Sequence, residues 1–552
     1  MRFGHIQLDD AEGAILAHTL HVEGGVLKKG RFLSADDVYA LGRAGITKVV
    51  AARLDSDDLH EDPAADRLAR AVAVRDLRIG AAFTGRCNLY AQSKGLVLYQ
   101  QALLDRLNLV DEAITLAALP PYHPVLHRQM VATIKIIPYG VSRQLVEQAE
   151  ELLKAFAGLI QLVPFQSKAV GLVQTQLAGT KVKLLDRTRN TLRARLESCG
   201  SRLHSESRCA HDPAGIADSL QQLLTAGCDL LLIAGASATT DRRDVLPMGI
   251  ESAGGVVERL GMPVDPGNLL VMGRCQGDVP VLGLPGCARS PAINGLDFVL
   301  QRLLAGLPLS AEEIGRMGGG GLLKGVPGFR SFRTDVEQGD PASKEPVYPA
   351  APRIAALVLA AGSSDRMGEQ NKLLLSVSGK PMVRQVVEQA LASQADSVSV
   401  VLGHEAELVG KSLADVDVHL VENPSYREGL SSSLRAGIEA LPNDVDGVLV
   451  CLADMPWVNS SDLNRLIAGY SELDGRLVCV PTWQGKRGNP VLWGKRFFDE
   501  IMALGGDQGA RKLIERHNDV LCEVPMSQSG VLRDIDNQEE ARLLAGSVLK
   551  DG

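Results

Sequence analysis

The sequence has little of what would assign it to several common protein classes. Its nine cysteines form no CxxC pair and no Cys/His cluster with zinc-ligand spacing. Aromatic residues make up only 4% of the chain. No stretch approaches the roughly 20 apolar residues that span a bilayer, and the first residues lack the basic and apolar segments of a secretory signal. The net charge of −8 argues against wholesale nucleic-acid binding. We therefore expect a cytoplasmic protein with neither a membrane nor a nucleic acid as partner.

The length of 552 residues exceeds what one ordinary core holds, because domains average roughly 150 residues. A segment rich in Gly, Pro and charged residues, without apolar periodicity, reads as a linker. Beyond it, strand and helix patterns alternate, as in a doubly wound α/β sheet whose ligands bind at the carboxyl ends of the strands. A second α/β unit begins near Gln129. The domains that we predict are 1–128, 129–314 and 353–552, with the linker at 315–352.

The strongest chemical signal lies at Leu357–Leu375, LVLAAGSSDRMGEQNKLLL. A buried strand, Ile354–Ala360, ends in small residues that let the backbone approach a base or a triphosphate. Arg366 and Lys372 add positive charge where a phosphoryl group becomes more negative in the transition state. The spacing is neither that of a P-loop nor GxGxxG. We expect nucleotide contacts at Ala360, Ala361, Gly362, Ser363, Gly368 and Lys372.

A second signal is the acidic residue in LVCLADMPWV, Leu449–Val458. Asp454 follows a buried strand at the carboxyl edge of the predicted sheet, where it can hold a metal over a nucleotide. Mg²⁺ takes one or two carboxylates together with substrate phosphates, so Asp454 can anchor it. The alternative, that Asp454 caps the next helix, is less favourable because Ser460 is better placed as a cap.

Several motifs in a fixed order resemble those of molybdenum cofactor cytidylyltransferases, over roughly residues 353–545. The resemblance implies a Rossmann-like, GT-A type domain that transfers CMP from CTP to Mo-molybdopterin, giving molybdopterin cytosine dinucleotide and pyrophosphate. It also implies that Arg366 and Lys372 neutralise the triphosphate and that Asp454 binds Mg²⁺. Asp536 is the candidate for the second carboxylate ligand, with Asp534 as the alternative. Ser431, Ser432 and Ser433, with Asn489 and Pro490, would line the substrate side. Besides the loop at 360–375, the motifs are those at 423–437, 451–458, 487–493, 506–514 and 534–540.

The choice of base depends on a few loop residues. The loop opens with Ala360, Ala361 and Gly362 rather than a Gly pair, and LLL follows Lys372, which resembles the cytidylyl branch and favours CTP over GTP. Asp365 departs from the commoner family form, which has a basic or neutral residue there. The alternatives are a guanylyltransferase of the same cofactor and a sugar-phosphate nucleotidyltransferase.

The N-terminal half resembles molybdopterin molybdenumtransferases over residues 12–54, 230–255 and 283–306. The resemblance implies an α/β domain that binds molybdopterin. The usual Gly pair after the binding strand is replaced by Ala234, Gly235 and Ala236, and the usual Asn after Pro-Gly is Cys287. These departures imply that metal insertion is lost and binding retained. The residues implied in binding are Gly235, Asp244, Pro285 and Gly286.

Both halves thus point to one metabolite, and we predict a two-part enzyme of molybdenum cofactor maturation. Its cofactor is Mg²⁺, and its substrates are CTP and Mo-molybdopterin. An alternative of another class is a cofactor-binding chaperone that delivers the cofactor to an apo-molybdoenzyme of the hydroxylase type.

Overall fold

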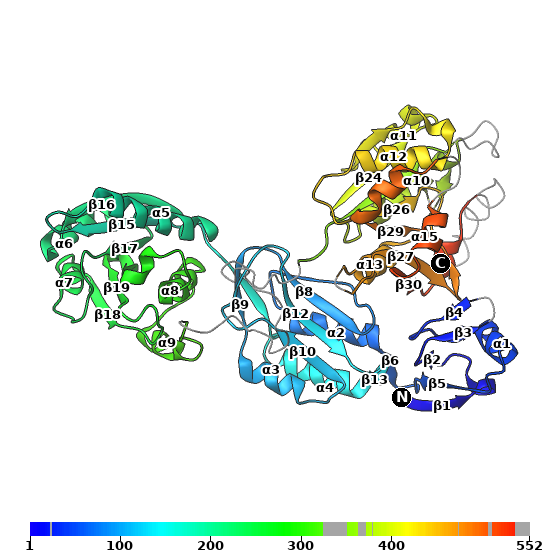
Figure 1. Cartoon of the computed structure of the whole chain (residues 1–552), viewed down its shortest axis with the longest axis horizontal. Coiled ribbons are helices and arrows are strands. Elements are labelled where there is room, and N and C mark those ends of the chain that lie inside the picture. Colours follow the sequence, from blue (N-terminus) through cyan, green and yellow to red (C-terminus); the bar gives the residue numbers. More distant parts are fainter. Residues whose placement is uncertain are drawn as a thin grey trace, which may run out of the picture.

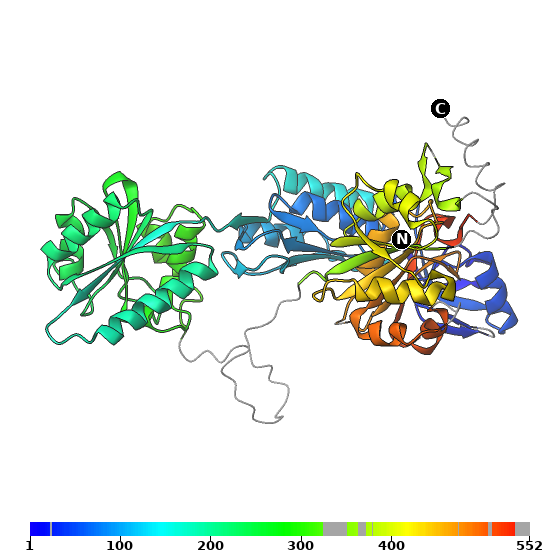
Figure 2. The same cartoon turned by 90° about the horizontal axis from the view of Figure 1, so that it is seen from above.

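The computed structural model describes residues 1–22, 25–323, 350–362, 371–377, 379–472, 474–505 and 510–535, without the side chain of Arg511. The elements gather into four packed units (Figure 1). Both views place the third unit at one end of the molecule and the first and fourth units toward the other (Figures 1 and 2). Among the described residues, no helix combines the length and the apolar character needed to cross a membrane.

The first unit is a small antiparallel sheet in the order β1-β5-β2, with one helix and a hairpin. Ser34 accepts a hydrogen bond from the backbone of Asp37, whose side chain binds back to the backbone of Ser34. This capping box starts the helix where the serine in the sequence indicates. The elements are β1 (Arg2–Gln7), β2 (Ile15–Leu16), β3 (Leu20–Val22), β4 (Gly25–Leu27), α1 (Ala35–Arg43) and β5 (Lys48–Arg53).

The second unit packs antiparallel strands in the order β10-β12-β8-β7 against helices α2 and α4. One hydrophobic core runs from Ala64 to Leu162. The domain boundary expected after residue 128 therefore falls inside this core, because β12 pairs with β8 from before the boundary. The elements are β6 (Asp58–His60), α2 (Glu61–Val72), β7 (Leu77–Ile79), β8 (Arg86–Ala91), β9 (Gly95–Leu98), α3 (Gln101–Asn108), β10 (Ile114–Ala118), β11 (Pro124–Val125), β12 (Met130–Ile136), β13 (Gly140–Ser142), α4 (Arg143–Lys154) and β14 (Gln161–Pro164).

The third unit is an α/β sheet in the order β16-β15-β17-β20-β19-β18, parallel from β16 to β20. Separate apolar clusters cover it, one including Leu232 and the other Leu231. Met317 is buried in the first cluster, so the opening residues of the expected linker at 315–352 pack on this unit. The elements are β15 (Ala169–Gln176), α5 (Val182–Ser198), β16 (Arg202–Ala210), α6 (Pro213–Thr225), β17 (Leu230–Ala234), α7 (Val245–Ser252), β18 (Val256–Leu260), β19 (Val271–Cys275), β20 (Val279–Gly283), η3 (Gly286–Arg289), α8 (Gly295–Leu304) and α9 (Ala311–Gly315).

The fourth unit is a mixed sheet in the order β25-β24-β21-β26-β29-β27-β28, with β30 added beside β27. Strands β25 to β26 are parallel, and β29 runs antiparallel to both neighbours. Every residue of β21 is buried, as its continuous apolar sequence indicates. The elements are β21 (Ile354–Ala360), η5 (Lys372–Leu374), β22 (Ser376–Val377), β23 (Lys380–Pro381), α10 (Met382–Leu391), β24 (Ser397–Leu402), α11 (Ala406–Lys411), β25 (His419–Glu422), α12 (Leu430–Glu439), β26 (Gly447–Leu452), α13 (Ser460–Gly469), β27 (Val478–Trp483), β28 (Lys486–Arg487), β29 (Val491–Gly494), α14 (Phe498–Met502), α15 (Arg511–Arg516), β30 (Leu521–Pro525) and η8 (Ser529–Leu532).

Candidate functional site

The carboxyl ends of β21 and β26 lie side by side at one edge of the fourth sheet. The two strands are parallel, with Leu359 opposite Leu452, and the backbone N–H of Ala453 donates to the carbonyl of Leu359 at 3.1 Å. This register brings the small residues that follow β21 and the acidic residue that follows β26 to the same edge. Such an edge is where open α/β sheets bind ligands.

Lys372 and Asp454 meet at this edge, as the sequence predicts for two residues of one site. The ammonium Nζ of Lys372 lies 2.7 Å from Oδ2 of Asp454. The backbone of Ile535 contacts both residues. Its N–H donates to the backbone carbonyl of Asp454 at 3.0 Å, and its carbonyl accepts from Nζ of Lys372 at 3.5 Å. A cation and a carboxylate are thus held together at the strand ends.

The other carboxylate oxygen of Asp454 accepts no hydrogen bond from the part of the chain that the structure describes. Its Oδ1 is buried and lacks a hydrogen-bond partner among the described residues. Leaving such an oxygen without a donor costs free energy, which a bound cation or a ligand donor offsets. Asp454 does not cap the following helix, because Asn459 caps α13 and accepts from Asp462. The cap that the sequence suggested, Ser460, is instead the first helical residue.

The region described contains no group of three or more His, Cys, Asp or Glu side chains that could hold a metal ion. Asp454 therefore offers a single carboxylate. This fits the coordination preference of Mg²⁺, which takes most of its ligands from phosphates and water. Asp536, the expected second carboxylate, lies outside the described residues, as do Ser363, Asp365, Arg366 and Gly368 of the loop.

Ala360 and Ala361 are buried in the core of the fourth unit, so only their backbone is available to a nucleotide. The side chain of Ala361 faces β24, where a Cβ on Gly403 would lie 2.7 Å from it. At Gly362, by contrast, an added Cβ would meet no described atom within 4 Å. With respect to the described residues, open space therefore begins at Gly362, where the sequence predicts close approach of a ligand.

The three serines at the start of α12 are buried, and an asparagine holds two of them. Nδ2 of Asn423 donates to the hydroxyl oxygens of Ser432 at 2.9 Å and Ser433 at 3.1 Å. The Ser432 hydroxyl donates in turn to the carbonyl of Gly429 at 2.9 Å. The hydroxyl of Ser431 is buried with no partner in the described structure. Sequence reasoning did not single out Asn423, although it opens the motif at 423–437.

Asn489 and Pro490 lie just before β29 and are joined by a cis peptide bond. The backbone N–H of Asn489 donates to the carbonyl of Val531 in η8 at 2.9 Å. A Cβ at the preceding Gly488 would overlap that same carbonyl, so only glycine allows this approach. The segment that contains Ile535 and Val531 thus touches both Asp454 and Asn489.

The candidate residues of the third unit also gather at one sheet edge, after β17 and β20. The carbonyl of Gly235 accepts from Nη2 of Arg289 at 2.8 Å, while Pro285 and Gly286 begin η3. Asp244 caps α7, since Oδ1 accepts from its neighbour Val245 at 2.7 Å and Oδ2 from the N–H of Thr240. Asp244 is thus a structural cap, and any ligand contact would use its remaining lone pairs.

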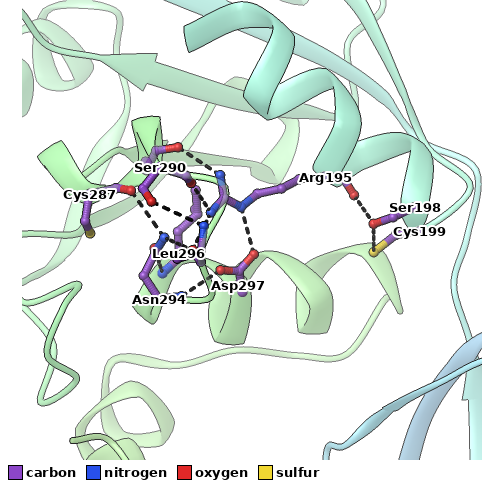
Figure 3. Close-up of polar contacts among 10 residues, drawn as sticks. Arg195, Ser198, Cys199, Cys287, Ser290, Asn294, Leu296 and Asp297 are labelled. Atoms are coloured by element: carbon purple, nitrogen blue, oxygen red, sulfur yellow. Dashed lines mark hydrogen bonds and ion pairs between the residues drawn. The ribbon is translucent and has the colours of Figure 1, made fainter. Parts of the chain in front are cut away.

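Arg195 of α5 fixes the loop between β20 and α8 (Figure 3). Its Nε lies 2.9 Å from Oδ1 of Asp297, and its side chain donates to the carbonyls of Ala288, Ser290 and Ala292. The other oxygen of Asp297 accepts from the N–H of Asn294, which caps α8. This loop, which includes Cys287, is therefore held from the neighbouring helix.

A histidine that the sequence gave no reason to select lies at the same edge. His211 follows β16, and its Nδ1 lies 2.8 Å from the hydroxyl of buried Thr175. Its Nε2 lies 2.9 Å from the hydroxyl of Ser237, in the loop after β17. The histidine joins two strand ends that are distant in sequence, which only the parallel pairing of β15 with β16 and β17 brings together.

Comparison with known proteins assigns the fourth unit. Residues 356–520 match the family model described as the MobA-like NTP transferase domain, and residues 5–53 match a domain of unknown function. The purine catabolism protein PucB of Bacillus subtilis is 30% identical over 202 residues, covering 34% of this chain and 95% of that protein. The nicotine blue oxidoreductase of Paenarthrobacter nicotinovorans is 26% identical over 200 residues, again with 34% and 95% covered.

Among solved structures, a nucleotidyl transferase from Methanothermobacter is 25% identical, with 36% of this chain and 99% of that chain covered and a TM-score of 0.33. The family model matched by residues 356–520 makes the fourth unit a nucleotidyltransferase-type domain within a mixed α/β chain. Since the chain covers 95% of a relative to which it is 30% identical, it belongs, through this domain, to the family of MobA-like NTP transferases.

Proposed function

We propose that the protein transfers CMP from CTP to Mo-molybdopterin, giving molybdopterin cytosine dinucleotide and pyrophosphate. The observation that carries the proposal is the contact of Lys372 with Asp454 at the carboxyl edge of a MobA-like domain. Family membership alone leaves the reaction class open, since one relative is named an oxidoreductase. A lysine and a carboxylate at one strand edge are the groups that a triphosphate requires.

In the proposed reaction, an oxygen of the terminal phosphate of Mo-molybdopterin attacks the α-phosphorus of CTP. The bond from this phosphorus to the oxygen that bridges it to the β-phosphorus breaks, and pyrophosphate leaves. Lys372 neutralises charge on the triphosphate, and the open space beside Gly362 receives the nucleotide. No covalent enzyme intermediate is needed, because positioning and charge stabilisation supply the catalysis.

Asp454, through its unpartnered Oδ1, would hold Mg²⁺ together with Asp536. The ion would supply charge neutralisation for the phosphates. The sequence around the loop favours CTP as the donor, with Arg366 beside the triphosphate and Ser431 to Ser433, Asn489 and Pro490 on the acceptor side. The rigid support of these groups by Asn423 and by η8 keeps the acceptor side in one geometry.

We further propose that the third unit binds Mo-molybdopterin at the loops after β17 and β20. Gly235, Asp244, Pro285 and Gly286 follow parallel strand ends at one edge, where backbone amides can contact a pterin and its phosphate. Arg195 and His211 stiffen this edge. The unit would bind the cofactor and supply it to the transferase domain, or to an apo-molybdoenzyme of the hydroxylase type.

The test is pyrophosphate release by the full chain, with CTP, GTP or ATP as donor and with Mo-molybdopterin or a sugar phosphate as acceptor. We expect release with CTP and Mo-molybdopterin, and a loss of about 100-fold or more in Asp454→Asn. Asp415→Asn is the matched control, because Asp415 is an exposed acid of the same unit that pairs with Arg384. Full activity in Asp454→Asn would overturn the assignment of the site.

The same assay separates the alternatives. Release with GTP alone would identify a guanylyltransferase, and release with sugar phosphates alone a transferase of another metabolite. Capture of an apo-hydroxylase by the inactive Asp454→Asn chain loaded with cofactor, with no nucleotide-dependent product from the wild type, would identify a delivery protein. Each outcome names a different function for the same described site.

A further inference from the structure

A cavity of about 1200 Å³ lies between the first, second and fourth units. It is distinct from the nucleotidyltransferase edge. Pro352 and Asp446 line it, and they precede β21 and β26, whose opposite ends lead to Gly362 and Asp454. The cavity and the site with Lys372 therefore lie at opposite edges of the same sheet.

An ion pair and hydrogen bonds join the second and fourth units at the cavity wall. Arg128 of the second unit forms an ion pair with Asp396 of the fourth, and its Nη2 donates to the carbonyl of Pro352 at 2.7 Å. Nε2 of Gln394 donates to the carbonyl of Ile79 at 3.2 Å. These contacts hold β7 against the fourth unit, so the cavity is bounded by fixed walls.

The acidic side chains of the cavity already have partners. Glu61 lies 3.2 Å from Nζ of Lys135, and Asp474 lies 2.9 Å from Arg476. Glu472 accepts a hydrogen bond from the hydroxyl of Tyr470 at 2.8 Å. Asp446 accepts one from the backbone N–H of Arg353, just before β21. Glu61 and Asp474 are therefore neutralised by ion pairs, whereas Asp446 and Glu472, both from the fourth unit, keep their negative charge.

Two cations on the same wall lack such partners. Neither Arg78 nor Arg86 has a carboxylate within ion-pair distance in the described part of the chain, and both line the cavity. The Arg78 guanidinium lies 5.1 Å from the centre of the Tyr90 ring. Burial lowers the pKa of Arg78 and the charge of Arg128 lowers it further, while Tyr90 and Asp396 raise it. Arg86 is exposed and Arg78 is half-buried, so Arg78, which has no directly paired carboxylate, is the cation that a bound anion would stabilise.

We propose that this cavity binds a phosphorylated small molecule that carries a planar ring, with Arg78 and Arg86 contacting its phosphate. Guanidinium groups match phosphate oxygens in a bidentate manner. Arg476 and Arg78 already lie over the rings of Phe83 and Tyr90, so the ring of Tyr139 on the cavity wall, whose buried hydroxyl has no hydrogen-bond partner among the described residues, is the surface offered to a heterocycle. The volume exceeds the roughly 300–1,000 Å³ of typical small-molecule pockets, so a nucleotide or a phosphorylated pterin fits. This binding site goes beyond the proposed transferase activity and does not depend on it.

The test measures equilibrium binding of CTP, CMP, GTP and Mo-molybdopterin, each as a separate probe, to the full chain by titration calorimetry. The chain carries Lys372→Met and Asp454→Asn, so that binding at the nucleotidyltransferase edge is removed. We expect a nucleotide probe to bind with one equivalent, or Mo-molybdopterin with one equivalent beyond that bound by the third unit, and Arg78→Gln to weaken this binding alone by about tenfold or more. The identity of that probe distinguishes a nucleotide from a pterin source.

Arg70→Gln is the matched control, because Arg70 lies in the same unit but is exposed and pairs with Asp66. Arg78→Lys retains the charge and should restore part of the affinity, which separates charge from packing. Hydrogen exchange without ligand should show the second unit at least as protected in Arg78→Gln as in Arg70→Gln, since Arg78 has no directly paired carboxylate to lose. Equal binding of a probe by Arg78→Gln and Arg70→Gln, or no binding of any of the four probes, would overturn the proposal.

Discussion

Replacing Arg195 by alanine should loosen one loop of the third unit. The Arg195 side chain is 10% exposed and that of Asp297 is 13% exposed, so both charges are largely withdrawn from water. Breaking such a pair by removing one partner costs about 3–5 kcal/mol. Asp297 keeps its bond from the backbone of Asn294 at 2.8 Å, which places the expected cost at the lower end, about 3 kcal/mol.

Hydrogen exchange read by mass spectrometry is the suitable measurement, because a chain with several cores does not unfold in one transition. A loss of about 3 kcal/mol corresponds to about 100-fold faster exchange of protected amides. We expect this acceleration in residues 284–304, which include the loop and α8, and no change in the fourth unit. Arg193→Ala is the control, since Arg193 is an exposed residue of the same helix.

Equal exchange of this segment in Arg195→Ala and Arg193→Ala would refute the reasoning. So would an acceleration spread evenly over the whole third unit, because Arg195 would then support the fold and not the loop. Arg195→Lys should recover little, since one ammonium cannot reach the carbonyls and the carboxylate that the guanidinium spans. If the third unit binds Mo-molybdopterin as proposed, affinity for it should fall together with the protection of the loop.

Three further predictions concern other parts of the molecule. Asn423→Ala leaves two buried serine hydroxyls without their donor and should destabilise the fourth unit by about 1–3 kcal/mol, measured as faster hydrogen exchange of that unit, with slower nucleotidyl transfer. Gly488→Ala places a Cβ against the carbonyl of Val531 and should lower the stability of the fourth unit by about 1–3 kcal/mol in the same assay. Gly475→Ala is the comparison, because its Cβ meets no described neighbour and the variant tests only the strain of a positive φ. The hydrogen bonds from Arg67 lower the pKa of Glu150 below its ordinary 4.5, so this pair stabilises the protein above pH 4.5 and the contribution is lost as the pH falls through the lowered pKa. Arg67→Met should therefore destabilise at pH 7 and have little effect at a pH below that lowered pKa, and an equal loss at both would contradict the ionic origin.

The fourth unit was predictable in large part because its strands are buried on both faces. A continuous apolar run is the sequence signature of such a strand, and it marks Ile354–Ala360 with the bounds that β21 has. Parallel pairing then brings strand ends together, which is why Lys372 and Asp454 could be assigned to one site before their contact was known. Asn423 could not be predicted, because its role depends on hydrogen bonds to serines at the start of the next helix, α12.

The second unit was not predictable by the same reasoning. Its core combines α2 and β8 with β12 and α4, which lie on either side of the expected boundary at 128. Antiparallel pairing between distant segments leaves no local signal, since each strand reads as an ordinary amphipathic run. The cavity beside Arg78 arises from contacts among three units, so no single motif could have indicated it.

The separation of the two proposed cofactor sites constrains how they could cooperate. The edge with Gly235 and Pro285 belongs to the third unit, and the edge with Asp454 belongs to the fourth, at a distance along the molecule in both views (Figures 1 and 2). A molybdopterin bound at the first edge must therefore leave it before CMP is transferred at the second. The benefit of joining the units in one chain is then a raised local concentration of the cofactor, which tethering can bring to the order of millimolar. Arg128 and Gln394 hold the second unit against the fourth, so freeing the third unit takes two cuts, one between β14 and β15 and one after α9. Making both cuts should accordingly raise the Mo-molybdopterin concentration needed for half-maximal transfer and leave the rate at saturation unchanged, because the cuts alter delivery and not the groups around Asp454.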